Sequence, residues 1–352
     1  MINMETTIWK RDTKGNVRYL AIATSDDLLI QTSGIFETTK PIVHSKVCTP
    51  KNVGKSNATT GEQQAIKQAQ ALEVKKLQEG YFATYAEARD NEVILPMLAK
   101  SEKGHIHKVD WTNAYVQPKL DGMRCLDIAD NKISRKNVAI KTMDHIKVVR
   151  PKGHDVIVDG ELYAHGYNFQ ENMRFIKKLG PDTTKVKFHV YDVVKPGMKF
   201  RDRNSLVKAI AANSPNLEYV PTFKVNSIEE VKQYHKIFLA DGYEGTMIRW
   251  GDDGYKINGR SDQLLKFKDF IDIDCKIISI GPAKNRPTWA RPVVEYKGKQ
   301  FVCSLKMSHA DKEEMLLNAH HYIGTTAEVR FFEFSENGIP RFPVCVGIRL
   351  DK

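Results

Sequence analysis

Cysteine is scarce in this chain, and its placement excludes two of its common uses. The five cysteines, Cys48, Cys125, Cys275, Cys303 and Cys345, are odd in number and never form a Cys-x-x-Cys pair. This spacing argues against a zinc ribbon and a disulfide framework, and it favours a reducing compartment. Long apolar runs are missing too: no stretch of about 18 apolar residues exists, and Met1–Lys10 has no signal-peptide core. We therefore expect a cytoplasmic protein that is neither secreted nor inserted in a membrane.

Acidic residues are outnumbered by basic ones. The 352 residues include 54 Lys and Arg against 43 Asp and Glu, which gives a formal net charge of +11. Residues 93–269 hold about +8 of this excess, and the flanking segments are close to neutral. Such a balance favours a polyanionic partner, with nucleic acid first, although a solvated basic face without a partner is the alternative.

Three segments differ in their sequence patterns. Residues 1–92 predict a small α+β unit, 93–269 alternate strands and helices, and 270–352 are rich in strand patterns. We see no internal repeat and no low-complexity tract. The last segment, with several strands and one short helix, suits a partly open barrel such as an OB-fold.

Hydrophobic periodicity places the expected elements. In the first segment these are strands Val17–Thr24 and Leu28–Thr32, the loop Thr49–Thr60, and helices Gly61–Glu79 and Thr84–Glu92. Pro96 and Lys100–Lys108 predict a connection or surface loop. Strands are expected at Ala114–Pro118, Met123–Ala129, Val156–Ala164, Val186–Val194 and Gly245–Arg249. Helices are expected at Phe169–Leu179, Arg201–Ala212, Ser227–Ala240 and Ala310–Ala319.

The most informative stretch is Lys119-Leu120-Asp121-Gly122-Met123-Arg124. A lysine amine becomes a nucleophile when nearby cations or a dry pocket lower its pKa. Gly122 permits a tight backbone approach, and Arg124 offers a cation for an anionic substrate. The six residues alone favour a polar surface Asp-Gly turn between two strands over a catalytic lysine.

Four further stretches supply matching chemistry. They are Asp159-Gly160-Glu161 at the end of an apolar strand, Tyr191-Asp192, Glu244-Gly245, and Lys266-Phe267-Lys268, whose lysines should point to one face of a strand. Each is weak alone: Asp-Gly-Glu also forms turns, Tyr191 also fits a core, and Lys-x-Lys also protects an edge strand. Together they provide an amine, carboxylates for Mg²⁺, cations for phosphates and an aromatic face for a base.

This order and spacing resembles the lysine nucleotidyltransferase superfamily, and most closely the ATP-dependent DNA ligases, over residues 93–352. The resemblance implies an ATP-grasp-like adenylation domain followed by an OB-fold. It implies that Lys119 carries AMP, that Glu161 and Glu244 hold Mg²⁺ or Mn²⁺, and that Tyr191 stacks on adenine. Further implied nucleotide contacts are Gln117, Leu120, Arg124, Glu161, Glu244, Lys266 and Lys268, and both of these lysines are implied to be catalytic.

Two other stretches belong to the same resemblance. Ser134-Arg135 looks like the family motif whose arginine meets the nucleotide or the nick phosphate, although the family has Asn-Gly where this chain has Lys136-Asn137. Arg341-Phe342-Pro343 and Gly347-Ile348-Arg349-Leu350-Asp351-Lys352 resemble the last ligase motif. In the family this motif orients the β,γ-pyrophosphate of ATP, which implies nucleotide contacts for Arg341 and Arg349. An ordinary barrel strand with basic ends is the structural alternative.

The N-terminal segment bears a softer likeness to a WGR-type nucleic-acid-binding domain. The likeness rests on Asn52–Asn57, Gln63–Gln70, Lys75-Lys76-Leu77 and Gly80-Tyr81. The Trp-Gly-Arg triplet is missing, and Ser33-Gly34-Ile35 stands where it would fall. The alternative is a structural cap of unrelated fold.

One basic stretch lies outside the family pattern. Lys284-Asn285-Arg286-Pro287-Thr288-Trp289-Ala290-Arg291-Pro292 is expected to form a proline-stiffened loop of the barrel. We expect Arg286 and Arg291, like Arg135 and Lys136, to contact nucleic-acid phosphates. A plain surface loop is the alternative.

The resulting expectation is a monomeric ATP-dependent DNA ligase, of bacterial or viral origin, that seals nicked duplex DNA. Its domains should be 1–92, 93–269 and 270–352. RNA ligases and mRNA capping guanylyltransferases share the Lys-x-Asp-Gly motif and remain alternatives. A third alternative is a non-catalytic nucleic-acid-binding protein.

Overall fold

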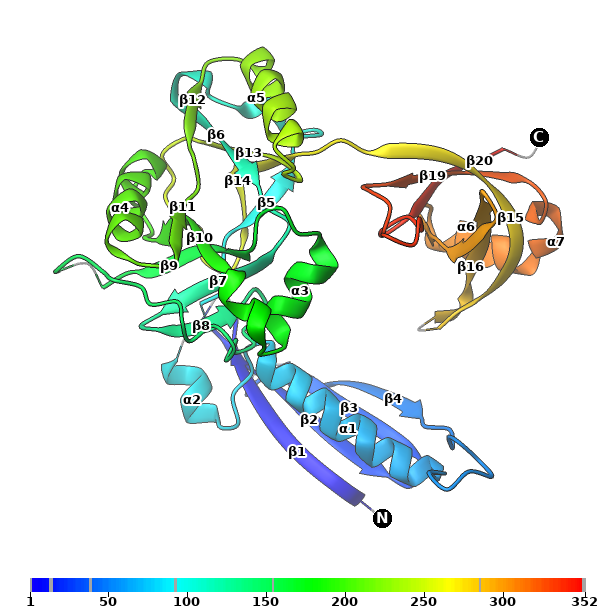
Figure 1. Ribbon diagram of the computed structural model, residues 1–352. Coiled ribbons are helices and arrows are strands. Elements are labelled where there is room, and N and C mark those ends of the chain that lie inside the picture. The colour runs from blue at the N-terminus through cyan, green and yellow to red at the C-terminus, as the bar shows by residue number, and fades with distance from the viewer. Residues whose placement is uncertain are drawn as a thin grey trace. The chain divides into compact units, whose positions relative to one another are not determined.

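The computed structural model describes residues 2–12, 15–37, 40–91, 94–153, 155–284 and 286–349. The chain forms two compact units, Met1–Lys266 and Phe267–Lys352 (Figure 1). The expected boundary at residues 269/270 lies close to this division, and the division assigns Lys266 and Lys268 to different units. The expected boundary at 92/93 falls outside the described residues. Among the described helices, none has the length and apolarity needed to cross a bilayer.

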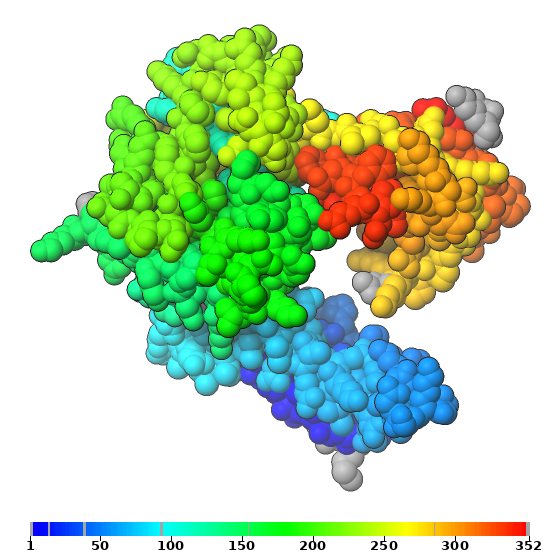
Figure 2. Space-filling view, in the orientation of Figure 1, coloured from blue at the N-terminus to red at the C-terminus, as the bar shows by residue number. Residues whose placement is uncertain are grey.

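The first unit begins with a four-stranded antiparallel sheet in the order β1-β2-β3-β4. Its strands are β1 (Ile2–Arg11), β2 (Val17–Ser25), β3 (Leu28–Ile35) and β4 (Ile42–Val47). Helix α1 (Gly61–Gln78) packs on one face of this sheet, where Ile8, Leu20, Ile22 and Leu29 meet Ala65 and Ala69. In Figure 2 the light-blue atoms of this helix cover the sheet on the side that faces the viewer.

The structure confirms the expected strands and helices of this segment and adds two strands. Thr60 caps α1 by accepting from the Gln63 amide, which is why the helix begins where it was predicted. The second helix, α2, is shorter than predicted and spans Tyr85–Asp90. Strands β1 and β4 were not predicted. Every residue of β4 is exposed, so that strand lacks the alternation that marks a half-buried strand.

The rest of the first unit contains two five-stranded sheets, in the orders β11-β10-β9-β7-β8 and β12-β6-β13-β14-β5. The strands of the former are β7 (Met123–Ile128), β8 (Asn131–Ser134), β9 (Ile157–Tyr163), β10 (Lys187–Val194) and β11 (Leu217–Tyr219). Those of the latter are β5 (Leu98–Ser101), β6 (Ala114–Lys119), β12 (Phe223–Val225), β13 (Gly245–Trp250) and β14 (Arg260–Phe267).

Three helices accompany these sheets, as the sequence predicts. They are α3 (Phe169–Lys177), α4 (Phe200–Asn213) and α5 (Ile228–Ala240), and short 3-10 turns occupy Ile106–Lys108, Trp111–Asn113 and Pro181–Lys185. In Figure 1, α4 lies beside β10 and β11, and α5 lies beside β6 and β13. A buried cluster that includes Val158, Phe188 and Ile210 joins the β11-β10-β9-β7-β8 sheet to α3 and α4.

Two details of this unit correct the sequence-based expectations. Lys100 belongs to β5 and pairs in parallel with Leu265 of β14, so the segment Lys100–Lys108 is only partly loop. Strand β14 ends at Phe267, so Lys268 lies beyond it and the two-residue alternation does not extend from Lys266 to Lys268. Parallel pairing with a distant segment is a tertiary contact that local periodicity cannot reveal.

The second unit is a six-stranded sheet in the order β17-β16-β15-β19-β20-β18, accompanied by two helices. Its elements are β15 (Ile271–Ala283), β16 (Arg286–Tyr296), β17 (Lys299–Val302), β18 (Ser304–Leu305), α6 (His309–Leu317), α7 (Ala319–Tyr322), β19 (Thr326–Phe331) and β20 (Val344–Arg349). Cys275, Cys303 and Cys345 are free cysteines that are buried in its core, so three of the five cysteines contribute to packing.

The expected loop over Lys284–Pro292 is a strand from Arg286 onward. Residues Arg286–Pro292 form the first part of β16, and Pro292, Arg291 and Ala290 pair with Ile280, Gly281 and Pro282 of β15. Asn285 lies outside the described residues, as do Leu350, Asp351 and Lys352 of the C-terminal motif. The proline-based prediction failed because both prolines lie close to irregularities in the β15–β16 register. Proline has no backbone N–H to donate, and this lack is tolerated where regular strand pairing is interrupted.

Candidate active site

Lys119 is the last residue of β6, and the pairing of β6 with β13 decides what it meets. Gly245 lies opposite Lys119, and the Glu244 backbone amide donates to the Lys119 carbonyl oxygen at 2.9 Å. The Lys119 Nζ donates to the Glu244 carboxylate, whose side chain is only 5% exposed. The amine also lies 3.5 Å from the Leu120 carbonyl oxygen. Two segments 125 residues apart therefore form one amine–carboxylate pair.

Two glycines allow the neighbouring strands to come this close. A Cβ atom at Gly122 would lie 2.3 Å from the Leu162 carbonyl oxygen, and one at Gly160 would lie 2.4 Å from the His189 carbonyl oxygen. Real Cβ atoms do not approach backbone oxygens to this distance. The glycines of Asp-Gly-Met-Arg and Asp-Gly-Glu are therefore required by strand packing, since any side chain would force the backbones apart.

A buried carboxylate holds the Arg124 side chain in place. Its Nε and Nη2 donate to the two oxygens of Asp159 at 2.7 and 2.5 Å, and Nη2 also donates to the Met97 carbonyl oxygen at 3.0 Å. The Tyr255 hydroxyl donates to the same carboxylate at 2.7 Å. This two-pronged arrangement holds the guanidinium in one orientation. It raises the pKa of Arg124 further above its usual range, although burial acts in the opposite direction.

Glu161 lies two residues after Asp159 on β9, on the same face of the strand. Burial raises its pKa to about 7, while the charges of Lys119 and Arg124 oppose this shift and the Glu244 carboxylate adds to it. The Tyr191 hydroxyl lies 3.3 Å from Glu161 and donates to the Gly160 carbonyl oxygen at 3.2 Å. Lys119, Arg124, Glu161, Glu244 and Tyr191, which the sequence analysis selected from four separate stretches, thus lie within one electrostatic neighbourhood.

Tyr191 and Gln117 both contact Arg249. The ring of Tyr191 lies 5.2 Å from the Arg124 guanidinium and 5.4 Å from that of Arg249. Gln117 is 1% exposed; its Oε1 accepts from Arg249 Nε at 2.6 Å and its Nε2 donates to the Thr222 hydroxyl at 2.8 Å. Leu120 is buried against Tyr191, together with Tyr163, Val220 and the partly buried Tyr243.

A buried ion network that sequence reasoning did not assign lies behind Gln117. Asp192 accepts from Arg203 Nε at 2.7 Å and from Arg249 Nη1 at 2.6 Å, and these two cations lower its pKa against the effect of burial. Arg249 therefore bridges Asp192 and Gln117. The only sequence signal was the position of an acid after Tyr191 and of an arginine five residues after Glu244, and neither spacing predicts that they meet.

The remaining predicted residues of the first unit lie on neighbouring elements. Lys266 is in β14, which pairs next to β13. Arg135 and Lys136 follow β8 in a tight turn, where Asn137 has a φ of 59° and the Ser134 hydroxyl accepts from the Val138 amide at 3.1 Å. Asparagine tolerates this left-handed conformation better than most residues, so Asn137 serves the turn without the family's glycine.

In the second unit the predicted arginines hold carboxylates of the same unit. Arg341 is paired with Glu333, and Arg349 Nη1 lies 2.9 Å from Asp274. Phe342, between Arg341 and Pro343, is 81% exposed and has a φ of 52°, which is strained for an aromatic residue. Lys268 Nζ lies 4.5 Å from the centroid of the Phe332 ring.

The two glutamates fit a small divalent cation. Mg²⁺ is usually held by one or two carboxylates together with substrate phosphates and water, rather than by a complete protein cage. Glu161 and Glu244 provide two largely buried carboxylates whose charges repel each other. No cluster of three or more His, Cys, Asp or Glu side chains suitable for a metal occurs among the described residues. The donor set therefore suits a metal that arrives with a nucleotide.

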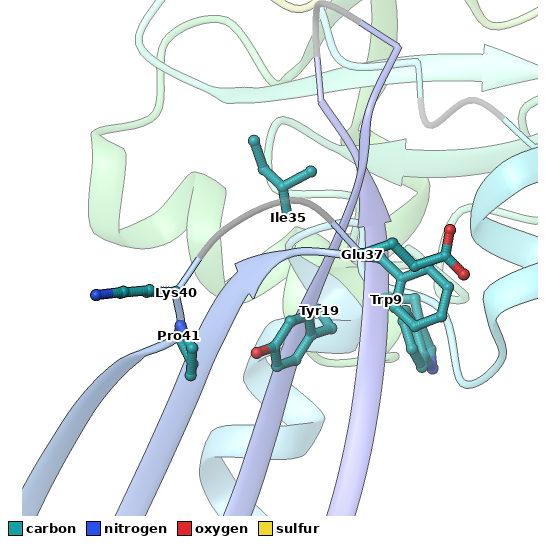
Figure 3. A pocket seen from close by; sticks show the side chains of 7 residues that line it. Trp9, Tyr19, Ile35, Glu37, Lys40 and Pro41 are labelled. Atoms are coloured by element: carbon teal, nitrogen blue, oxygen red, sulfur yellow. The ribbon is translucent and has the colours of Figure 1, made fainter.

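A group of aromatic side chains lies on the N-terminal sheet, on the face opposite α1. Trp9 and Tyr19 are cross-strand neighbours with ring centroids 6.1 Å apart, and Phe36 and Tyr85 contact Trp9 edge-on at 5.2 and 5.5 Å. Figure 3 shows Trp9 and Tyr19 with Ile35, Glu37, Lys40 and Pro41 around a pocket of about 710 Å³. The N-terminal segment thus offers an aromatic pocket, which its Ser, Lys and Asn motifs did not indicate.

Comparison with known proteins identifies the family of this chain. The family model for the ATP dependent DNA ligase domain matches residues 96–268, and that for the DNA ligase OB-like domain matches residues 288–349. The chain belongs to the ATP-dependent DNA ligase family. This confirms the resemblance and the fold class inferred from Lys119–Arg124 and its companion motifs, whereas the WGR-like likeness of residues 1–92 remains a prediction.

Individual relatives of this ligase-family chain are distant. The DNA ligase of Enterobacteria phage T6 is 26% identical over 307 residues, which cover 66% of this chain and 62% of the phage protein. The DNA ligase of African swine fever virus (strain Badajoz 1971 Vero-adapted) is 25% identical over 344 residues, which cover 87% of this chain and 79% of the relative. The chain thus spans about 62% of the length of the phage relative.

A solved Lig E DNA ligase structure shares the fold. It matches with a TM-score of 0.61 and 24% identity, and the match covers 73% of this chain and 100% of that one.

Proposed function

We propose that this protein is an ATP-dependent DNA ligase that joins a 3′-hydroxyl to a 5′-phosphate at a nick in duplex DNA. The observation that carries the proposal is the contact between the Lys119 amine and the buried Glu244 carboxylate, with Arg124, Glu161 and Tyr191 around it. Family membership supports the same reaction. The proposal covers substrate, cofactor and site residues together.

The proposed reaction has three displacements at phosphorus. The Lys119 amine, after loss of a proton, attacks the α-phosphorus of ATP; an N–P bond forms and the bond to pyrophosphate breaks. A 5′-phosphate oxygen then takes the AMP group, so that the N–P bond breaks and a phosphoanhydride forms. The 3′-hydroxyl finally attacks the 5′-phosphorus and AMP leaves. One ATP thus yields one phosphodiester bond, AMP and pyrophosphate.

The pocket residues would position groups and balance charge rather than form bonds, Lys119 excepted. Glu244 orients the amine through their direct contact and is its nearest proton acceptor. Arg124, held by Asp159, offers its remaining face to phosphate or sugar oxygens. Tyr191 and Gln117 would contact the base. Mg²⁺ held by Glu161 and Glu244 would neutralise phosphate charge.

A covalent-labelling experiment tests the central step. Incubation with α-labelled ATP should give a labelled protein for the natural chain and none for Lys119→Ala or Lys119→Arg, because neither supplies a free amine with the right reach. Lys208→Ala is the matched control, since Lys208 is an exposed lysine on α4. A label that persists in Lys119→Arg would remove the proposed nucleophile.

Substrate assays separate the rivals within the superfamily. Nicked DNA, nicked RNA and a triphosphate-ended transcript should be compared, each with ATP and with GTP. Joining of nicked DNA with ATP is the expected result. Preferential joining of RNA would favour an RNA ligase, and GMP transfer to a transcript would favour a capping enzyme. Absence of any nucleotide adduct would leave a non-catalytic nucleic-acid-binding protein.

Residues 1–92 are proposed to add a nucleic-acid contact to a monomeric enzyme. The aromatic rings at the pocket of Figure 3 support this, because bases stack on exposed aromatic side chains regardless of sequence. Tyr19→Ala should weaken binding of nicked DNA without altering adenylation of Lys119. Equal binding by this variant would favour a structural cap. A molar mass in solution equal to one chain is the expected oligomeric result.

A further inference from the structure

A cluster of cations surrounds one tryptophan on the second unit. The Arg286 guanidinium lies 4.2 Å from the centroid of the Trp289 ring, and Lys312 Nζ lies 4.7 Å from it. The His309 ring centroid is 4.4 Å from that of Trp289. Arg286 and Trp289 belong to β16, while His309 and Lys312 belong to α6. These four residues are called the Trp289 cluster below.

Strand geometry extends the cluster along β16. Ala290 is buried in the barrel core, so its neighbours Trp289 and Arg291 project from the opposite, outer face of the strand. Arg291 is exposed and lies two residues, or about 7 Å, beyond Trp289 on that face. The cluster and Arg291 therefore form one continuous basic surface with an aromatic centre.

The arginines of this unit differ in their partners. Arg330, Arg341 and Arg349 each hold a carboxylate, namely Asp272, Glu333 and Asp274. Within the described part of the chain, Arg286, Arg291 and Lys312 form no ion pair. Glu313, the acid that approaches this surface, accepts from the Thr288 hydroxyl at 3.0 Å. In the described part of the barrel, carboxylates of the same unit thus neutralise the charges of three arginines. The other two arginines, both on β16, have no such partner.

This arrangement favours binding of an external anion. Two cations over one indole are each attracted to its ring face, yet they repel each other because both charges are positive. A phosphate bound beside either cation would add an attraction that no carboxylate among the described residues supplies through an ion pair. The ring meanwhile holds both cations near their working positions, which lowers the entropy lost on binding.

We propose that the Trp289 cluster, with Arg291, is a binding site for the phosphates of a nucleic-acid backbone. This inference deepens the proposed function, because it names part of the surface that would hold its substrate. Its contacts are to phosphate, so they add affinity and orientation but no sequence preference. The site is separate from the Lys119 pocket in the sequence and shares no residue with it.

Salt dependence of binding tests the proposal directly. Binding of a nicked duplex with a 3′-dideoxy end, which cannot be joined, should be measured over a range of salt concentrations. Each lost phosphate contact lowers the slope of log K against log salt by about 0.9 for B-form DNA. The Arg286→Gln/Lys312→Gln double variant should therefore lose about 1.8 from the slope, with unchanged adenylation of Lys119.

Two control variants make the result specific. Arg286→Lys/Lys312→Arg keeps both charges and should keep the slope. Lys208→Gln removes another exposed lysine, one that lies 5.2 Å from the Tyr219 ring in the first unit, and should also leave the slope unchanged. Thermal melting confirms that each variant is folded before binding is measured.

The outcomes separate this inference from the proposed function. A slope that the Gln double variant does not change overturns the phosphate site, whether or not Lys119 is adenylated. An equal loss of slope in Lys208→Gln also overturns it, since net charge would then explain the effect. Competition by polyglutamate that depends on Arg286 and Lys312, with unchanged DNA binding, would instead assign the surface to an acidic protein. Failure of adenylation with an altered slope would remove the proposed function and leave the phosphate site standing.

Discussion

The two units each hold an arginine against an aromatic ring, and they treat its charge in opposite ways. Arg124 lies 5.2 Å from Tyr191 and is matched by two hydrogen bonds to Asp159, whose side chain has 0% exposure. Arg286 is itself exposed, lies 4.2 Å from Trp289 and, among the described residues, forms no ion pair with a carboxylate.

The difference follows from how deeply each arginine is buried. A buried guanidinium without a counter-charge is too costly to fold, so the first unit supplies the carboxylate itself and uses the pair to fix the pocket. An exposed guanidinium is stabilised by water, so the second unit can leave its partner to be an external anion. Arg124 is therefore part of a rigid frame, and Arg286 is available for binding.

Removal of the internal carboxylate should have the largest effect on stability. Asp159→Asn leaves Arg124 buried without its counter-charge and weakens its two hydrogen bonds, so we expect a loss of about 3–5 kcal/mol in the free energy of unfolding. Urea unfolding of natural and variant protein gives the measurement. A loss under about 1 kcal/mol would mean that water reaches Arg124 and that the contrast between the two arginines is mistaken.

The pH dependence of stability should reveal Glu161. Its pKa is about 7 in the folded protein against an ordinary value of 4.5, so folding favours its protonated form. Its contribution to stability is therefore full below pH 4.5 and is lost as the pH rises through 7. Relative to Glu161→Gln, which has no such titration, the natural protein should lose on the order of 2–3 kcal/mol across this window.

Magnesium provides the second half of this test. At pH 8 the carboxylate is ionised, so Mg²⁺ should raise the melting temperature of the natural protein and have little effect on Glu161→Gln. Calcium at equal concentration serves as a comparison for size selectivity. A pH profile that is the same in both proteins would contradict burial as the cause of the raised pKa.

Glycine substitutions compare backbone packing in the two units. A Cβ at Gly122 would collide with the Leu162 carbonyl oxygen, whereas a Cβ at Gly281 of β15 would have nothing within 4 Å. Gly122→Ala should cost about 1–3 kcal/mol through forced strand displacement and should also slow adenylation of Lys119. Gly281→Ala should be neutral or slightly stabilising. Similar costs at both positions would indicate that the strands at Lys119 can separate freely.

The smallest effect is expected at the exposed arginine. Arg286→Gln should change the free energy of unfolding by no more than about 0.5 kcal/mol, because the side chain is exposed and forms no ion pair with any residue that the structure describes. Differential scanning calorimetry against Asp159→Asn measures the contrast directly. A cost above about 2 kcal/mol would place Arg286 among the structural residues and weaken its role as a binding group.

Some elements could be predicted from the sequence because their signals are local. Helix α1 begins after Thr60, which forms a capping box with Gln63, and β9 and β10 are rich in β-branched and aromatic residues, so capping and composition indicate them directly. Strand β4 is exposed along its whole length and the start of β16 contains two prolines, so both resemble loops until their pairing partners are known. Pairing with a distant strand is a tertiary property.

The sequence by itself determined the chemistry of this protein: an amine, three acids, an aromatic ring and paired lysines in the order of a ligase. Residue types and spacing suffice for that, because reactivity belongs to the functional groups. Only the tertiary structure decided which groups meet. The pairing of β6 with β13 brings Glu244 to Lys119, and Arg249 reaches Gln117 and Asp192 through a buried network. The tertiary structure also decided which arginines pair with a carboxylate of the protein and which, like those on β16, do not. Burial and proximity depend on the folded chain.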